Sequence, residues 1–463
     1  MTFLYEICPY DQGKLNKSDF IMINTLIIIS FSRADIHSAF LKIFFFVLLF
    51  SFSNTFVSVA QTEDVYFQKS SIKTVQLYKL GWKMSFPVIQ LNSNDQLVLS
   101  FDDLGEETKN YNYTIVHCDH NWNPSDLLET EYMKGFGQNP INDYQFSFNT
   151  KFIFTHYKLV FPNRDFQILK SGNYLVKVYE DNDRDNPVLT WPFMVYEPLV
   201  QIVPRIKYST HSSRYREMQE IDFSILHPRF IIDNPIDEIK VKIMQNGRLD
   251  NQIKDLKPVF IRAGELVYDY NIENVFEGGN EFRWLDIRST RFAPEYVKAI
   301  NFHDPYFHIE LFPSSPRYDK SYFYKEDFNG KYYVEVREYN DPDIEADYVY
   351  VHFSLPRREP FVDGDVYVLG GLSNWKLNET NKMIYNAETM TYELTLLLKQ
   401  GFYNYQYAFK KHGESKASLR TLEGSFSQTE NDYRIYVYYK RTGDYYDHLI
   451  GVSISNSLKY TRP

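Results

Sequence analysis

The sequence predicts an all-β protein with three consecutive immunoglobulin-like or early-set antiparallel β-sandwich domains that follow a signal peptide. Beyond Gln61, apolar and polar residues alternate with a period of two, for example in Tyr174–Tyr179 and Tyr433–Tyr438. No segment there keeps the 3.6-residue apolar period of a helix over three turns. Turn-forming clusters such as Asp181–Pro187 separate the alternating runs, which is the spacing typical of sandwiches.

The composition agrees with strands and argues against nucleic acid as a partner. Aromatic residues make up 17% of the chain, with 39 Tyr and 37 Phe against 5 Trp. These side chains suit the half-buried face of a pleated sheet. The formal net charge is −10 and no basic cluster interrupts it, whereas binding a phosphate backbone needs a positive patch.

A secretory signal peptide is predicted at residues 41–60. Arg33 and Lys42 precede the largely apolar run Ile43–Phe52, and Ser58-Val-Ala60 supplies small residues before the cleavage point. This run is too short to span a hydrocarbon layer of about 30 Å.

The depth of this signal in the chain indicates that residues 1–40 are an over-extended start, with initiation near Leu41. Removal of residues 1–60 takes away Cys8 and leaves Cys118 as the single cysteine, so we expect no intrachain disulfide. The mature chain shows no second long apolar run, so we expect an exported, soluble protein without a membrane span.

At 463 residues the chain is too long for one small core, so we expect two or three domains, and a weak internal repeat favours three. Their predicted bounds are 61–197, 198–314 and 315–456. One boundary falls near Tyr196-Glu-Pro198 and the other near Pro313-Ser-Ser-Pro316. A glycine turn that leads into an aromatic strand recurs after Ser171, at Gly278 and after Gln400, which supports three units.

The segment Tyr113–Trp122 holds the densest set of reactive side chains. His117 and His120 have the spacing of half a zinc site, but no second Cys/His pair follows them. Cys118 as a nucleophile needs a neighbouring base, and in a strand His117 points to the opposite face. A metal site and a nucleophile therefore remain the minor alternatives.

Our main interpretation of this segment is structural. We expect Cys118 to be a small buried residue at a strand end, with Asp119 or Asn121 shaping the turn and Trp122 packing beneath it. The acidic run at Asp181–Asp185 lacks the glycine and the glutamate that a calcium-binding loop requires at its later positions. No catalytic motif occurs, so we expect no enzyme activity, no cofactor and no metal.

The C-terminal region contains a second informative pattern. Asp365–Trp375, followed by Tyr385, Tyr392–Leu396 and Gly401–Tyr407, resembles early-set glycan-binding modules. In that family a sugar stacks on aromatic rings, which implies a platform here of Trp375, Tyr403 and Tyr405. The family commonly uses a second tryptophan, and Trp375 is the last one in this chain.

Residues 111–163 carry a longer series of motifs in a fixed order. They are Tyr111–Trp122, Ser125-Asp-Leu127, Glu131–Phe136, Asn139–Tyr144, Ser147–Thr150, Thr155-His-Tyr157 and Phe161-Pro-Asn163. This series resembles the plug protein of the type IX secretion system of Bacteroidota. The likeness continues through Asp327–Gly330, Ala346–Val349 and Gly370–Trp375, and so covers about residues 65–455.

The resemblance implies a non-enzymatic periplasmic plug that closes the periplasmic opening of a large outer-membrane β-barrel translocon, with which it associates peripherally. The alternative is a periplasmic or surface glycan-binding protein that uses the C-terminal domain. For the plug we expect the contact in the connection from Ser125 to Asn149, because long ordered loops commonly carry binding. The candidate contact residues are Trp122, Tyr132, Gly135, Phe136, Asn139 and Tyr144.

Overall fold

The computed structural model describes residues 65–105 and 107–461, so the predicted start and signal peptide lie outside the described residues. Strands dominate, and every described helix has four residues or fewer. The helices are α2 (Glu129–Tyr132), α3 (Pro235–Glu238), α4 (Pro342–Glu345), η1 (Gly371–Ser373), α5 (Arg420–Glu423) and α6 (Leu458–Thr461). The prediction of an all-β fold built from sandwiches is confirmed. Within the described ranges, no helix has the length and apolar character to cross a membrane.

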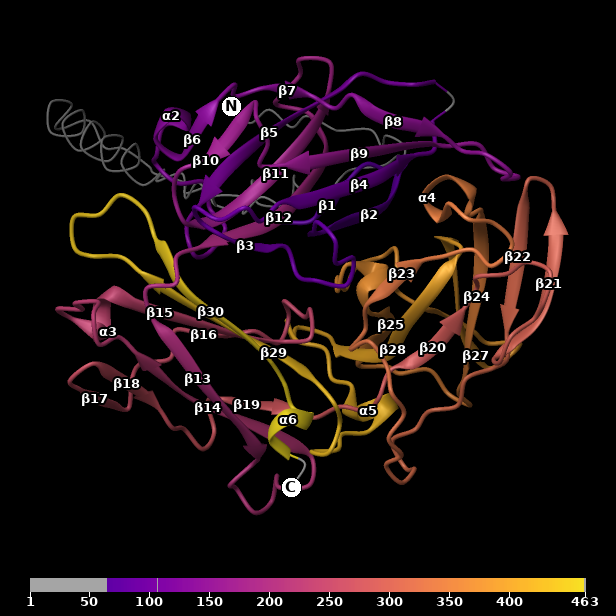
Figure 1. Cartoon of the computed structure of the whole chain (residues 1–463). Coiled ribbons are helices and arrows are strands. Elements are labelled where there is room, and N and C mark those ends of the chain that lie inside the picture. Colours follow the sequence, from indigo (N-terminus) through magenta and orange to yellow (C-terminus); the bar gives the residue numbers. More distant parts are fainter. Residues whose placement is uncertain (1–64, 106, 462–463) are drawn as a thin grey trace, which may run out of the picture. The chain divides into compact units, whose positions relative to one another are not determined.

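The N-terminal sandwich, indigo to magenta in Figure 1, packs two main sheets around one core. One sheet has the order β1-β12-β11-β5-β7, with β3 parallel to β12; the other has the order β2-β4-β9-β8, and β6 pairs with β10. The strands are β1 (Phe67–Gln68), β2 (Ile72–Lys79), β3 (Val88–Gln90), β4 (Leu97–Asp103), β5 (Tyr111–Cys118), β6 (Met133–Gly135), β7 (Asn139–Pro140), β8 (Asp143–Phe146), β9 (Thr155–Phe161), β10 (Phe166–Ile168), β11 (Gly172–Glu180) and β12 (Pro187–Tyr196).

Strand β4 shows why this sequence forms a strand that is buried on both faces. Leu97, Leu99 and Phe101 alternate along it and belong to the core of the N-terminal sandwich. Asp102 lies on the opposite face and bonds with Lys399 of another sandwich. All seven residues of β4 are consequently buried.

The central sandwich pairs a sheet of order β13-β14-β18-β17, to which β19 adds on β14, with a sheet of order β16-β15-β29-β30. Its core contains Ile221, Ile243 and Ile435. The strands are β13 (Gln201–Tyr208), β14 (Met218–Leu226), β15 (Ile239–Gln245), β16 (Ile253–Lys254), β17 (Phe260–Arg262), β18 (Glu265–Tyr268), β19 (Val275–Glu277), β29 (Asp432–Tyr439) and β30 (His448–Asn456).

The third sandwich pairs a sheet of β20, β28, β23 and β25 with a sheet of order β21-β22-β24-β27-β26. Val351 and Tyr405 lie in its core. The strands are β20 (Arg283–Asp286), β21 (Val297–His303), β22 (Tyr306–Leu311), β23 (Tyr332–Val334), β24 (Tyr348–Pro356), β25 (Gly364–Leu369), β26 (Ile384–Asn386), β27 (Thr391–Lys399) and β28 (Gly401–Lys411).

The chain order of the sandwiches differs from the consecutive order expected from the sequence. Strand β29 pairs with β15 along its length, from Ile239 opposite Tyr439 to Gln245 opposite Tyr433, and β30 pairs with β29. In Figure 1 the yellow strands β29 and β30 accordingly lie beside the pink strand β15. Residues 432–456 therefore complete the central sandwich, and β20 to β28 form an insertion within it. The expected division at 314/315 falls inside this inserted sandwich, after β22.

An apolar cluster joins the N-terminal and central sandwiches, and we call it the apolar junction. Its buried members are Val88, Met194, Met244, Tyr436, Tyr438 and Leu449. Trp122 and Tyr196 pack against this cluster from the N-terminal side. Burial of apolar area of this kind is non-directional and roughly proportional to the area removed from water.

Candidate functional site

In the reactive segment at the end of β5, His117 makes internal hydrogen bonds with both of its ring nitrogens. His117 Nε2 lies 3.1 Å from the Ser171 carbonyl oxygen, so it donates there, and Nδ1 accepts from Ser125 Oγ at 2.8 Å. Burial lowers the pKa of His117 to about 4, which keeps the ring neutral. Both ring nitrogens are therefore occupied.

The expected burial of Cys118 and the expected turn at Asp119 are confirmed. Cys118 is completely buried at the end of β5. Asp119 Oδ1 accepts from the backbone N–H groups of Asn121 at 2.7 Å and Asn123 at 2.9 Å, which shapes the turn. Trp122 follows with a φ of 71° and packs against the apolar junction.

Asp119, His120 and Asp447 bring three metal-ligating side chains within 4.8 Å of one another. Asp447 Oδ2 accepts from His120 Nδ1 at 2.9 Å, and Lys240 Nζ lies 3.3 Å from its Oδ1. Burial raises the pKa of Asp447, but the hydrogen bonds from His120 and the charge of Lys240 hold it far below its ordinary value. A lysine already supplies the positive charge that a cation would bring, so we interpret the cluster as an ion-pair contact between two sandwiches.

The structure separates the six residues of the predicted contact loop. Tyr132 and Asn139 are buried, and Trp122 belongs to the contact with the central sandwich. Gly135 has a φ of 121°, and a Cβ there would lie 2.0 Å from the Asp165 carbonyl oxygen, so its role is to permit the close approach of the paired strands β6 and β10. Phe136 and Tyr144 are exposed.

Phe136 and Tyr144 do not form one patch. Phe136 directly follows β6 and Tyr144 lies in β8, and Figure 1 shows these strands at opposite ends of the N-terminal sandwich. The loop therefore runs along the sandwich instead of gathering its aromatic residues at one point. At the Tyr144 end, further exposed apolar side chains follow closely in the sequence.

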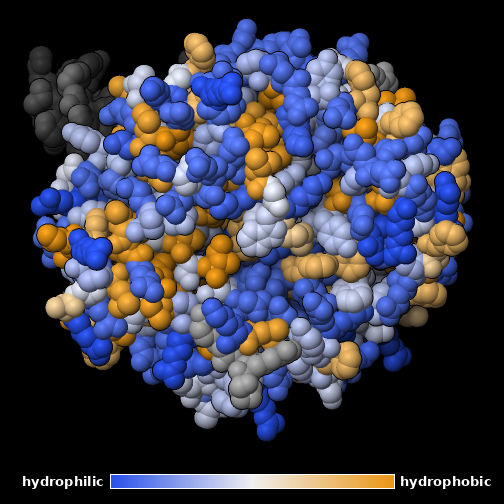
Figure 2. All heavy atoms as spheres, in the orientation of Figure 1, coloured by the Kyte–Doolittle hydropathy of each residue, from blue (hydrophilic) through white to orange (hydrophobic). Residues whose placement is uncertain are grey.

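Those side chains follow one another along β8 and the loop after it, and we call the set the β8 surface. Its members and their exposed fractions are Tyr144 (45%), Phe146 (59%), Phe148 (63%) and Ile153 (74%). Strand β8 ends the order β2-β4-β9-β8, so one of its edges pairs with no strand of the described residues. An exposed apolar edge strand of this kind is a template for pairing with another chain. On the face shown in Figure 2, apolar atoms also gather over both the N-terminal and the central sandwich.

The loop after β8 is held firmly by the inserted sandwich. The N–H of Phe148 donates to the Ile344 carbonyl oxygen at 2.9 Å. The N–H groups of Lys151 and Phe152 donate to the two carboxylate oxygens of Asp347 at 2.7 and 3.1 Å. Fixed backbone bonds at both ends of the loop therefore preorganise the β8 surface.

A buried polar network lies beside this loop, and we call it the charged junction. Asp102 of β4 accepts from Lys399 Nζ, from the Tyr348 hydroxyl and from His156 Nδ1, each at 2.6 Å. Lys399 also donates to the Asp343 carbonyl oxygen at 2.6 Å. Burial raises the pKa of Asp102, but the charge of Lys399 and the bond from His156 hold it below its ordinary value.

Sequence reasoning missed the charged junction entirely. Asp102 and Lys399 lie 297 positions apart, and each sits in an ordinary strand pattern. The one available signal was an acidic residue directly after the apolar run Leu97–Phe101, which by itself is equally typical of a strand end.

The rings expected to form a glycan platform do not form one. Tyr403 and Tyr405 are 2% and 3% exposed and lie in the core of the inserted sandwich, where Tyr403 stacks on Tyr332 at 4.9 Å between ring centroids. Trp375 is half-buried and packs edge-to-face against Phe282 at 6.0 Å. Neither tyrosine ring is available to stack a sugar.

The alternation of β28 explains this result. Tyr403 and Tyr405 face inward, so Phe402 faces outward, where it packs against Trp284 of β20 and Tyr333 of β23 at 5.6 and 5.8 Å. These outward rings were not singled out from the sequence. Lys325 Nζ lies 3.7 Å from the Trp284 ring centroid, and the Arg288 guanidinium lies 5.5 Å from that of Phe402.

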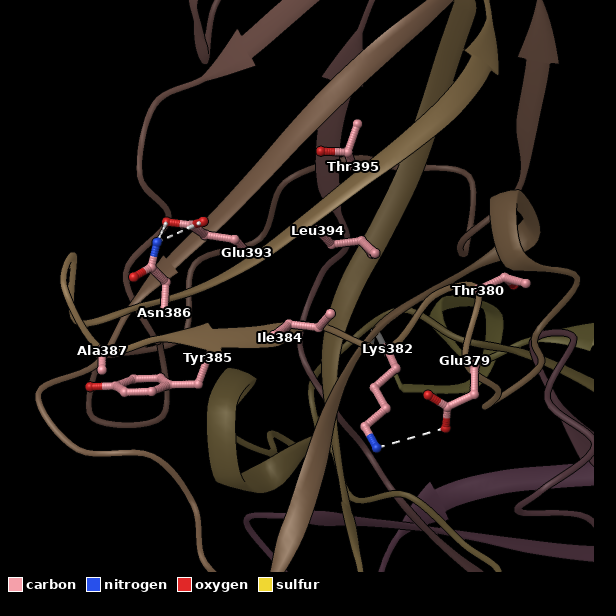
Figure 3. Close-up of a pocket in the computed structure, with 10 residues that line it drawn as sticks. All are labelled: Glu379, Thr380, Lys382, Ile384, Tyr385, Asn386, Ala387, Glu393, Leu394 and Thr395. Carbon is pink, nitrogen blue, oxygen red and sulfur yellow. Dashed lines mark hydrogen bonds and ion pairs between the residues drawn. The ribbon is translucent and has the colours of Figure 1, made fainter. Parts of the chain in front are cut away.

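A shallow hollow runs along β26 and β27 of the inserted sandwich (Figure 3). Its charged groups pair with their own neighbours: Lys382 with Glu379 at 3.7 Å, and Asn386 with Glu393 at 3.3 and 3.4 Å. Figure 3 shows no convergence of these groups on one point. The hollow therefore lacks the focused polar groups that usually orient a small ligand.

Comparisons with known proteins find a matching family model and similar solved structures. The family model described as type 9 secretion system plug protein 1st domain matches residues 72–197. A solved structure of a hypothetical protein from Parabacteroides merdae is similar with 38% sequence identity and a TM-score of 0.82, over 84% of this chain and 98% of that one. No curated protein matches the chain. The matched family segment contains both the β5 turn and the β8 surface.

Proposed function

The chain belongs to the family of type IX secretion system plug proteins, and we propose from this premise that it closes the periplasmic opening of the outer-membrane translocon of that system. Family membership gives the chain a role in type IX secretion. The proposed role is non-enzymatic, because closing an opening requires binding and release and no change of covalent bonds. The protein then acts in the periplasm, peripherally associated with the translocon.

A rigid scaffold supports this proposal. Two buried junctions tie the N-terminal sandwich to the central and the inserted sandwiches. A plug must cover a wide aqueous opening and leave it again. A preordered surface loses little conformational entropy on docking, so modest contact energy suffices for reversible closure.

The β8 surface is the single observation that best supports a docking site. Aromatic residues are enriched at the centre of protein interfaces, and the β8 surface presents three of them on β8 and on the loop after it, whose backbone is held by fixed bonds. The unpaired edge of β8 adds backbone N–H and C=O groups, with which a strand of the translocon would pair. Of the six residues expected from the sequence, Tyr144 lies in this surface, and Phe136 is proposed as a separate contact at the other end of the sandwich.

The test is affinity purification of the protein from native membranes of its host. The double variant Phe146→Glu with Phe148→Glu places two charges on the β8 surface. We expect it to lose more than about tenfold of the co-purifying outer-membrane barrel, because hot-spot aromatic residues each contribute about 2 kcal/mol or more.

The matched control lies on the central sandwich. Phe260 and Ile261 are equally exposed on β17, which is also an edge strand, so Phe260→Glu with Ile261→Glu should leave recovery of the barrel unchanged. Equal loss in both double variants would overturn the assignment to β8. If the wild-type protein co-purifies with no barrel and is retained on a starch-like resin, the plug function is overturned in favour of the glycan-binding alternative.

A further inference from the structure

Three histidines form a row on the outer face of the larger sheet of the inserted sandwich. His303 lies on β21, His308 on β22 and His352 on β24, which are neighbours in the sheet order. The ring centroids of His303 and His308 are 5.0 Å apart, and those of His308 and His352 are 5.2 Å apart. The proposed plug function uses none of them.

Two of these rings have the separation of metal ligands. His308 Nδ1 lies 2.9 Å from His352 Nε2. Zinc–imidazole bonds are about 2.0–2.1 Å long, so two such nitrogens lie about 2.9 Å apart at a right angle and about 3.3 Å apart in a tetrahedral site. An ion between the two nitrogens therefore needs a shift of the rings of only a few tenths of an ångström.

A hydroxyl group orients the second ring. Thr395 Oγ1 on β27 lies 2.9 Å from His352 Nδ1. When His352 Nδ1–H donates to this oxygen, Nε2 carries the lone pair and faces His308. Metal-bound histidines almost always donate their other N–H in this way.

Glu310 can supply a third donor after a change of rotamer, since its carboxylate oxygens do not lie within 4.8 Å of both facing nitrogens. It lies on β22, directly opposite His352 of β24, and two positions after His308 on the same face. Among the described residues, its carboxylate has contacts of 3.4 Å with Asn301 Nδ2 and Lys298 Nζ. Lys298 is well exposed. Asn301 and Lys298 can therefore release the Glu310 carboxylate at little cost, and it can then adopt a rotamer that points toward solvent.

We propose that His308, His352 and Glu310 bind a Zn²⁺ ion on the outer face of this sheet, with water completing the coordination. Imidazole and carboxylate are both common zinc ligands, and three protein ligands plus water make an open site. The ion would connect β22 to β24, the parallel pair of the sheet. This inference does not depend on the plug function.

The test uses the tag-free mature chain, titrated with ZnCl₂ by calorimetry. We expect one equivalent to bind and the thermal midpoint to rise with zinc. His308→Ala and His352→Ala should each weaken binding by more than about tenfold, whereas Thr395→Val, which removes only the orienting hydroxyl, should weaken it by about tenfold. His412→Ala, at an exposed histidine of the same sandwich, should bind zinc as the wild type does.

Circular dichroism of the metal-free variants shows whether they fold. If His352→Ala does not fold, His308→Gln on the neighbouring strand provides the same measurement. The Co²⁺-loaded protein gives a second readout, since its visible spectrum should lose the imidazole-dependent bands in both histidine variants. Absence of zinc binding in the wild type, or binding unchanged in the double variant of His308 and His352, would overturn the proposal.

Discussion

The N-terminal sandwich meets its two neighbours through junctions that differ in their main chemistry. Toward the central sandwich, Met194, Met244 and Leu449 belong to an apolar cluster, with the ion-pair contact of His120 and Asp447 beside it. Toward the inserted sandwich, Asp102 and Lys399 form a buried ion pair at 2.6 Å. The apolar contact gains free energy in proportion to area, whatever its exact geometry. The ion pair is favourable in one geometry only, because both charges lose their hydration.

The difference suggests separate tasks for the two junctions. We hypothesise that the apolar junction supplies most of the binding energy, and that the charged junction fixes the position of the inserted sandwich. The motivating observation is that Lys399 bonds both Asp102 and the carbonyl of Asp343 in α4, beside the residues that hold the loop of the β8 surface. A shifted charged junction would then change the presentation of that surface.

The largest expected effect comes from breaking the charged junction on one side. Lys399→Met leaves Asp102 buried without its cation, which should cost about 3–5 kcal/mol of unfolding free energy in urea titrations. Adding Asp102→Asn should recover much of this loss, since no buried charge then remains. Lys158→Met on β9 is the control, with an expected change within about 0.5 kcal/mol. A cost below about 1 kcal/mol for Lys399→Met would refute the importance of the pair.

Truncation at the apolar junction should cost less and behave differently. Leu449 is completely buried on β30, so Leu449→Ala should lose about 3 kcal/mol through lost burial and the cavity that remains. The cost should be the same at low and high salt, unlike an electrostatic effect. Ile454→Ala on the exposed part of the same strand is the control. Strong salt dependence for Leu449→Ala would contradict the distinction between the junctions.

A buried carboxyl without a cation should show the opposite pH dependence. Burial raises the pKa of Glu281 from 4.5 to about 8. The folded state therefore binds a proton that the unfolded state releases, and stability falls as pH rises from about 4.5 to about 8. Asp102, whose pKa is lowered, contributes stability above its unfolded pKa and loses it as pH falls further.

Glu281→Gln should accordingly gain about 2 kcal/mol over the wild type on going from pH 6 to pH 8. Urea titrations at both pH values measure this difference. Glu388→Gln, at an exposed glutamate, should give the same difference as the wild type. A Glu281→Gln curve parallel to that of the wild type would show that this carboxyl does not retain its proton.

The smallest effect is expected at the rim of the charged junction. Lys83 Nζ lies 3.1 Å from Asp343 Oδ1, and both side chains are partly exposed. Lys83→Ala should cost less than about 1 kcal/mol, and the cost should shrink further in high salt. A cost comparable to that of Lys399→Met would mean that burial is not what distinguishes the two pairs.

The sequence was informative wherever local alternation decides the structure. The run Leu97–Phe101 lies in β4, Tyr174–Tyr179 in β11, and Tyr433–Tyr438 in β29. The turn at Asp119 and the burial of Cys118 were predicted too, since both follow from turn chemistry and strand geometry within ten residues.

Long-range features could not be predicted in this way. Nothing local indicates that Asp432–Tyr439 returns to pair with Ile239–Gln245, so the insertion was missed. The inward direction of Tyr403 depends on the register of β28, where a shift of one residue reverses every side chain. The six expected contact residues were scattered because burial depends on packing partners that lie far away in the chain.

The central claim is that the β8 surface docks on the translocon, and site-specific crosslinking in native membranes tests it most directly. A photo-activated residue at Phe148 should give one adduct with the outer-membrane barrel, and the same residue at Phe260 should give none. An adduct from position 260 with none from position 148 would contradict the account. So would the absence of a barrel adduct from both positions.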